Sequence, residues 1–61
     1  MTQAELVAAL RELATEMIRV GVAIDYYGGL KQMGEKGRQM IEAGKMARDW
    51  AAAIEEEEPT E

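Results

Sequence analysis

Large apolar residues recur along the first half of the chain at alternating steps of three and four positions. The series is Leu6, Leu10, Leu13, Met17, Val20, Ile24 and Tyr27. This spacing is typical of a helix that buries one stripe against another helix. Thr2 and Glu5 have the spacing of a capping box, so we expect a helix over residues 3–27.

A second series with the same steps follows Gly28-Gly29, the strongest stop signal in the chain. It mixes small residues with large ones: Leu30, Met33, Gly37, Met40, Gly44, Ala47, Ala51 and Ile54. We therefore expect a turn at 28–29 and a second helix over residues 30–57. Pro59 ends this helix, and residues 59–61 should form a frayed acidic tail.

These two series predict an all-α fold, in which residues 1–58 form an antiparallel helical hairpin of two long helices. Folding back at the glycines pairs Leu13 with Gly44, and Val20 with Gly37. Large residues of one helix then interdigitate with small residues of the other, as native packing density requires. The rival arrangement is one continuous helix that runs through the glycines and bundles with copies of itself.

More apolar and small residues lie beside these two stripes, where a lone hairpin would leave them in water. We expect them to form the interface of a helical-bundle homo-oligomer, most simply a dimer that makes a four-helix bundle. An antiparallel partner would also bring Asp25 of one chain to Arg48 of the other and fix the register. The predicted interface consists of Val7, Ala14, Ile18, Gly21, Asp25, Arg48 and Trp50.

The small size of the chain also indicates self-association. A chain of 61 residues buries too little surface for secure stability, and such chains rely on disulfides, a metal or self-association. The sequence contains neither cysteine nor histidine. Self-association is therefore the expected route to stability.

Charge and hydropathy limit the location and the partners. The net charge is −5, with basic residues concentrated in the middle and acidic residues at the end, so duplex DNA is an unfavourable partner. We find no apolar run long enough for a membrane span and no signal-peptide pattern at the first residues. The expected location is the cytoplasm.

Catalysis is not expected, because the chain lacks serine, cysteine and histidine and has no nucleophile–imidazole pair. We predict no catalytic residue, no metal site and no cofactor.

The most unusual segment combines two adjacent tyrosines, two glycines and nearby cations. Glycines let a ligand approach backbone N–H groups, and tyrosine offers a stacking face, so an anionic ligand such as a nucleotide would suit it. The residues of this candidate ligand site are Tyr26, Tyr27, Gly28, Gly29, Lys31, Lys36 and Arg38. The ordinary interpretation is a turn, a packed tyrosine and a solvated face.

The sequence therefore predicts a non-enzymatic protein that acts by binding, as a protein-interaction, adaptor or inhibitor module. The first alternative is sequestration of a small anionic ligand, such as a phosphorylated compound, across the oligomer. The second is a small nucleic-acid-binding regulator.

Overall fold

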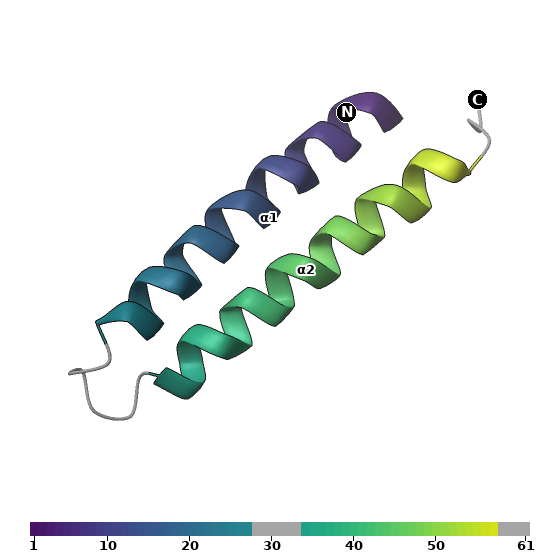
Figure 1. Ribbon diagram of the computed structural model, residues 1–61. Helices are drawn as coiled ribbons and strands as arrows, with labels where there is room; N and C mark the ends of the chain where they lie inside the picture. The colour runs from purple at the N-terminus through teal and green to yellow at the C-terminus, as the bar shows by residue number, and fades with distance from the viewer. Residues whose placement is uncertain (28–33, 58–61) are drawn as a thin grey trace.

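The computed structural model describes residues 1–27 and 34–57, which form two helices and no strand. Helix α1 spans Gln3–Tyr26 and helix α2 spans Gly34–Glu56. The helices lie side by side and run in opposite directions (Figure 1). The predicted helical hairpin is thus confirmed, and the rival single continuous helix is wrong. The predicted turn at 28–29, the start of the second helix at 30 and the tail at 59–61 lie outside the described residues.

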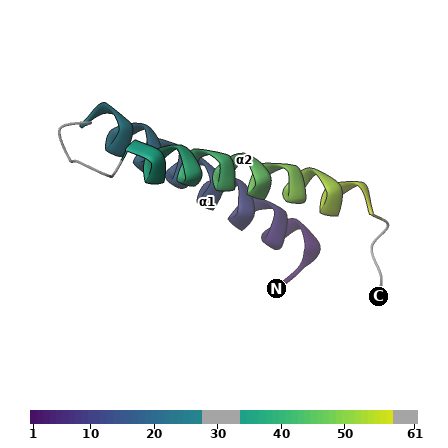
Figure 2. The ribbon, with the colours of Figure 1, turned by 90° about the horizontal axis from the view of Figure 1, so that it is seen from below.

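The hairpin is a thin rod, whose Cα atoms extend 49 × 14 × 11 Å. The two helices cross at a shallow angle, as the view from below shows (Figure 2). We call the end where α1 begins and α2 ends the open end, and the opposite end the turn end. Neither α1 nor α2 contains a stretch long and apolar enough to span a bilayer.

Helix α1 begins at the predicted capping box. The Thr2 hydroxyl accepts a hydrogen bond from the backbone N–H of Glu5 at 3.1 Å, and the Glu5 carboxylate accepts one from the backbone N–H of Thr2 at 3.4 Å. Two N–H groups that lack partners in the first turn of a helix are satisfied in this way. At the other end, the backbone N–H of Tyr27 still donates to the carbonyl of Ala23.

The contact line between the helices, which we call the seam, is built from small residues. Among the described residues no buried side chain is larger than valine. Three of the buried positions in each helix recur every seven residues, which keeps them on one side of the helix. The buried residues are Val7, Ala14 and Gly21 in α1, and Gly37, Gly44, Ala47 and Ala51 in α2.

At the glycines of the seam the two backbones touch. A Cβ atom added to Gly37 would lie 2.8 Å from the carbonyl oxygen of Gly21, and one added to Gly21 would lie 2.7 Å from that of Gly37. A Cβ on Gly44 would lie 3.0 Å from the carbonyl oxygen of Ala14. The hydrogen that glycine carries at each of these positions points at a carbonyl of the other helix, as in weak Cα–H···O contacts.

The structure corrects the predicted packing of the first helix. Leu13 and Val20, which were expected to face glycines, are 53% and 44% exposed, and Gly44 contacts Ala14 and Ile18 instead. Helix α1 is turned from the predicted orientation, so that Ala14 and Gly21, each one residue further along, are buried in the places expected for Leu13 and Val20. The physical reason is that small residues facing small residues let the backbones approach more closely than leucine facing glycine does.

We predict that Gly37→Ala destabilises the protein, although alanine is the better helix former by about 1 kcal/mol. The new methyl group meets the backbone of α1, which cannot move aside without opening the seam, and overpacking of this kind costs about 1–3 kcal/mol. Chemical denaturation at fixed protein concentration measures the change.

Gly34→Ala is the matched control, because a Cβ there meets only a carboxylate oxygen of Asp25 at 3.8 Å. We expect it to leave stability unchanged or to raise it slightly. Equal effects of the two substitutions would contradict backbone contact at the seam.

Candidate functional site

The seam divides the hairpin surface into two faces of different chemistry. On one side, Arg11 of α1 forms an ion pair with Glu55 of α2. Ile18 lies against Gly44, and Ile41 lies against Gly21. Ile18 is one heptad after Arg11 and Ile41 is two heptads before Glu55, so both lie on the same side of the hairpin as the ion pair. We call this side the ion-pair face; its residues are Arg11, Ile18, Asp25, Ile41, Arg48 and Glu55.

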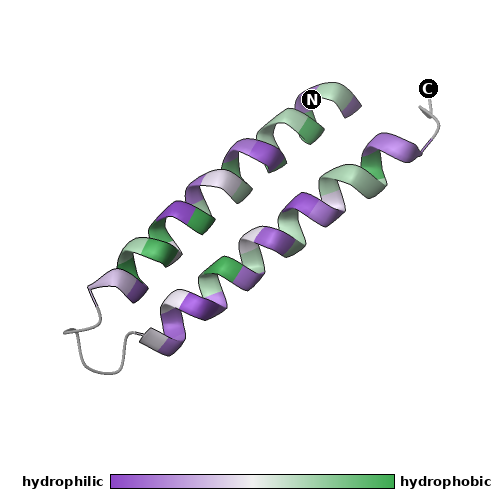
Figure 3. Ribbon diagram, viewed as in Figure 1, coloured by the Kyte–Doolittle hydropathy of each residue, from purple (hydrophilic) through white to green (hydrophobic). Residues whose placement is uncertain are grey.

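The other side of the seam is almost wholly apolar, and we call it the apolar face. Its inner rows are half-buried beside the seam, and its outer rows are largely exposed: Leu6 is 39%, Leu13 53%, Val20 44% and Trp50 56% exposed. Bands of hydrophobic colour recur along both helices (Figure 3). The residues are Leu6, Leu10, Leu13, Met17, Val20 and Ile24 of α1 with Met40, Ala43, Ala47, Trp50 and Ile54 of α2.

The apolar face offers contact rather than chemistry. Its side chains carry no group that titrates, and the only hydrogen-bonding side chain among them is the indole of Trp50. Full burial of an exposed leucine or valine side chain contributes about 1.5–3 kcal/mol, and about half of that is available here because these side chains are already about half buried. This face is therefore suited to contact with another apolar surface.

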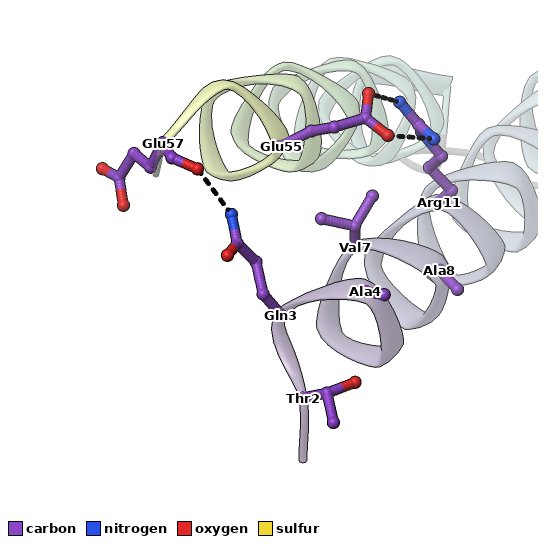
Figure 4. A pocket seen from close by; sticks show the side chains of 8 residues that line it. All are labelled: Thr2, Gln3, Ala4, Val7, Ala8, Arg11, Glu55 and Glu57. Atoms are coloured by element: carbon purple, nitrogen blue, oxygen red, sulfur yellow. Dashed lines mark hydrogen bonds and ion pairs between the residues drawn. The ribbon is translucent and has the colours of Figure 1, made fainter. Parts of the chain in front are cut away.

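At the open end of the hairpin, hydrogen bonds from a side chain at the start of α1 connect it to the end of α2. The side-chain amide of Gln3 donates to the carbonyl oxygen of Ile54 at 2.6 Å. It also donates to the carbonyl oxygen of Glu57 at 2.9 Å (Figure 4). Ile54 lies in the last turn of α2 and Glu57 directly follows the helix, where carbonyls lack their usual helical N–H partners. The Ile54 carbonyl also accepts a hydrogen bond from the backbone N–H of Glu57 at 3.2 Å. Gln3 thus caps the end of α2 from the start of α1.

An ion pair lies next to this cap. The Arg11 guanidinium contacts both carboxylate oxygens of Glu55, at 2.8 and 3.3 Å. Between the cap and the ion pair is a hollow of about 510 Å³, open to solvent, with Val7 and Ala8 on its floor (Figure 4). The side chains of Gln3, Arg11 and Glu55 around it are engaged in these bonds between α1 and the end of α2, which indicates a structural role in joining the helix ends.

The structure distributes the residues of the predicted oligomer interface among three places. Val7, Ala14 and Gly21 are buried in the seam of a single hairpin, so the hairpin itself already uses them. Another three lie on the ion-pair face: Ile18, Asp25 and Arg48. Trp50 alone lies on the apolar face. On α1 the seam thus contains three residues that were assigned to the oligomer interface, whereas Leu6, Leu13 and Val20, which were assigned to the seam, are exposed.

The candidate ligand site is only partly described. Tyr26 and Tyr27 are 82% and 64% exposed, and their rings meet edge to face with centroids 5.3 Å apart. Lys36 and Arg38 are exposed on α2, and because they are two residues apart they point to different sides of that helix. Gly28, Gly29 and Lys31 lie outside the described residues. The structure brings the tyrosines together but does not bring Lys36 and Arg38 to one point.

Within residues 1–27 and 34–57, no three acidic side chains gather as a metal ion would require. Comparison of the chain with protein-family models, with characterised proteins and with solved structures gives no match.

Sequence reasoning missed the Gln3 cap and the Arg11–Glu55 pair, because their partners are 51 or 54 and 44 residues away and no local pattern marks them. The seven-residue recurrence of Val7, Ala14 and Gly21 is the signal that could have located the seam on α1.

We predict that Gln3→Glu lowers the free energy of unfolding by about 1 kcal/mol, because it replaces the donor of two hydrogen bonds by a carboxylate that faces carbonyl oxygens. Thermal and denaturant unfolding would measure the loss. Gln39→Glu adds the same charge at an exposed position of α2 and serves as the control. Equal losses in both variants would show that charge alone, and not the cap, is responsible.

Proposed function

We propose that this chain is a non-enzymatic protein-interaction module that works as a homo-oligomer, in which a second copy covers the apolar face. One observation carries the proposal: the hairpin buries one valine and three alanines while it leaves Leu13, Val20 and Trp50 about half exposed. A protein that folds for its own stability normally buries its large apolar side chains first. The large side chains here are placed to be covered by something else.

The surface area supports the same proposal. The chain exposes 4978 Å² at a mass of 6.8 kDa, whereas a compact globule of that mass exposes about 4,000 Å². The excess of about 1,000 Å² is close to the area of about 800 Å² that each partner buries in a standard protein–protein interface.

Helical hairpins stack face to face as four-helix bundles, in which the apolar faces form the core. In such a bundle the ion-pair face of each copy stays on the outside. We propose that this outer surface binds the protein that the module recruits or inhibits, as an adaptor does. The predicted contact between Asp25 and Arg48 of two chains has no place in this arrangement, since both residues lie on the outer side.

We predict that Val20→Glu shifts the protein toward the monomer and raises the dissociation constant at least tenfold, because an ionised carboxylate would have to enter an apolar interface. Sedimentation equilibrium measures the constant, and the emission of Trp50, the single tryptophan of the chain, should move to longer wavelength as the ring becomes solvated.

Val22→Glu is a matched control, because Val22 is 53% exposed on the same helix but lies four residues after Ile18, on the side of the ion-pair face. We expect it to assemble normally. A wild-type chain that remains a sharply melting monomer at all concentrations would contradict the proposed function.

A further inference from the structure

One row at the outer edge of the apolar face continues to a charged residue beyond each end of that face, and the order of its residues is complementary to the same order reversed. Along the outer side of α2, every seventh residue is, in order, Lys36, Ala43, Trp50 and Glu57. The row therefore begins with a cation, continues with a small and then a large apolar residue, and ends with an anion. Glu57 follows the last residue of α2, and its carboxylate is directed away from Gln3 and Arg11 (Figure 4).

We infer that a second copy of this chain docks antiparallel across the apolar face, with Trp50 of each chain over Ala43 of the partner subunit and Lys36 beside Glu57 of the partner subunit. This inference rests on the proposed function and adds the orientation of the two copies. The two-fold axis then passes α2 between residues 46 and 47 and is perpendicular to the helices. Each contact occurs twice, as an isologous interface demands.

The middle of the row supplies shape complementarity. Trp50 is 56% exposed and projects from α2, whereas Ala43, two turns earlier, leaves a shallow step. An antiparallel copy brings the indole of Trp50 of one chain into the space left beside Ala43 of the partner subunit, so that a large side chain packs against a small one. In the same antiparallel alignment, Leu13 of α1 contacts Leu10 of the partner subunit. The apolar contact therefore continues across the whole face.

The ends of the row select the orientation. Gly21 lies against Gly37, so residues of α1 near 22 are level with Lys36. If the two-fold axis instead ran along the helices, α1 of the partner subunit would cover α2, and Lys36 would face the level of Val20 and Ile24. A lysine covered by apolar side chains without an acid partner is strongly unfavourable. The antiparallel arrangement gives the same lysine a carboxylate.

Charge reversal at the two ends tests the orientation in the intact protein. We expect Lys36→Glu or Glu57→Lys alone to weaken dimerisation about three- to tenfold in low salt, and the double variant to restore it to within about twofold. The differences should shrink in about 1 M salt, where the Debye length is about 3 Å. Sedimentation equilibrium gives the dissociation constants.

Arg38→Glu makes the same charge change two residues away, at an exposed position off the apolar face, and should have little effect. If the native chain is a dimer but Lys36→Glu and Arg38→Glu behave alike, the antiparallel orientation is wrong and the proposed function stands. If the native chain is a monomer, both the antiparallel orientation and the proposed function are wrong.

Cross-linking provides a second and independent readout, since the chain has no cysteine of its own. Lys36→Cys and Glu57→Cys are prepared separately and then mixed under oxidising conditions. We expect a disulfide dimer only in the mixture, because an antiparallel interface sets residue 36 of one chain beside residue 57 of the other and keeps like positions far apart. A dimer formed by either variant alone would overturn the orientation.

Discussion

The backbone contact between Gly21 and Gly37 is the constraint on which the rest of the structure depends. Each glycine inside a helix costs about 1 kcal/mol relative to alanine, so Gly21, Gly37 and Gly44 together weaken the isolated helices by about 3 kcal/mol. Their positions explain why that cost is tolerated: a Cβ atom at any of them would lie within about 3 Å of the backbone of the opposite helix. The glycines are needed where they stand because no other residue lets the two helices come so close.

Close approach of the helices has a direct consequence for the large side chains. With the backbones in contact there is no room for leucine or tryptophan in the seam, so these residues are displaced to its side and collect on the apolar face. The seam buries only Val7 and three alanines as apolar side chains. At about 0.8 kcal/mol per CH₂ group, covering Leu13, Val20 and Trp50 contributes more free energy than that whole set. The same close packing that forms the hairpin therefore leaves a large apolar surface exposed, and the proposed self-association would cover it.

The sequence predicts the number of helices, their direction, the capping box at Thr2 and the buried positions of α2, because each follows from local spacing or capping chemistry. It does not predict the rotation of α1. Two overlapping stripes with the same period, one led by Leu13 and the other by Ala14, both satisfy the helical pattern, and only the distance between the backbones decides between them. That distance is a property of both helices together. Likewise, Gln3 acquires its role only because the hairpin brings the last carbonyls of α2 within its reach.

In the proposed dimer, stability, affinity and orientation depend on different residues. The Arg11–Glu55 pair is about half exposed, and a pair of this kind contributes less than about 1 kcal/mol, so it adds little to what the glycine contacts already determine. The apolar face supplies a large but non-directional attraction, which would hold two copies in either orientation. Charges at the rim of an interface act chiefly on orientation and association rate. In the proposed dimer, a row with Lys36 at one end and Glu57 at the other would supply what the apolar face lacks, since it would distinguish the two ends of the rod while leaving the core of the contact free of charge.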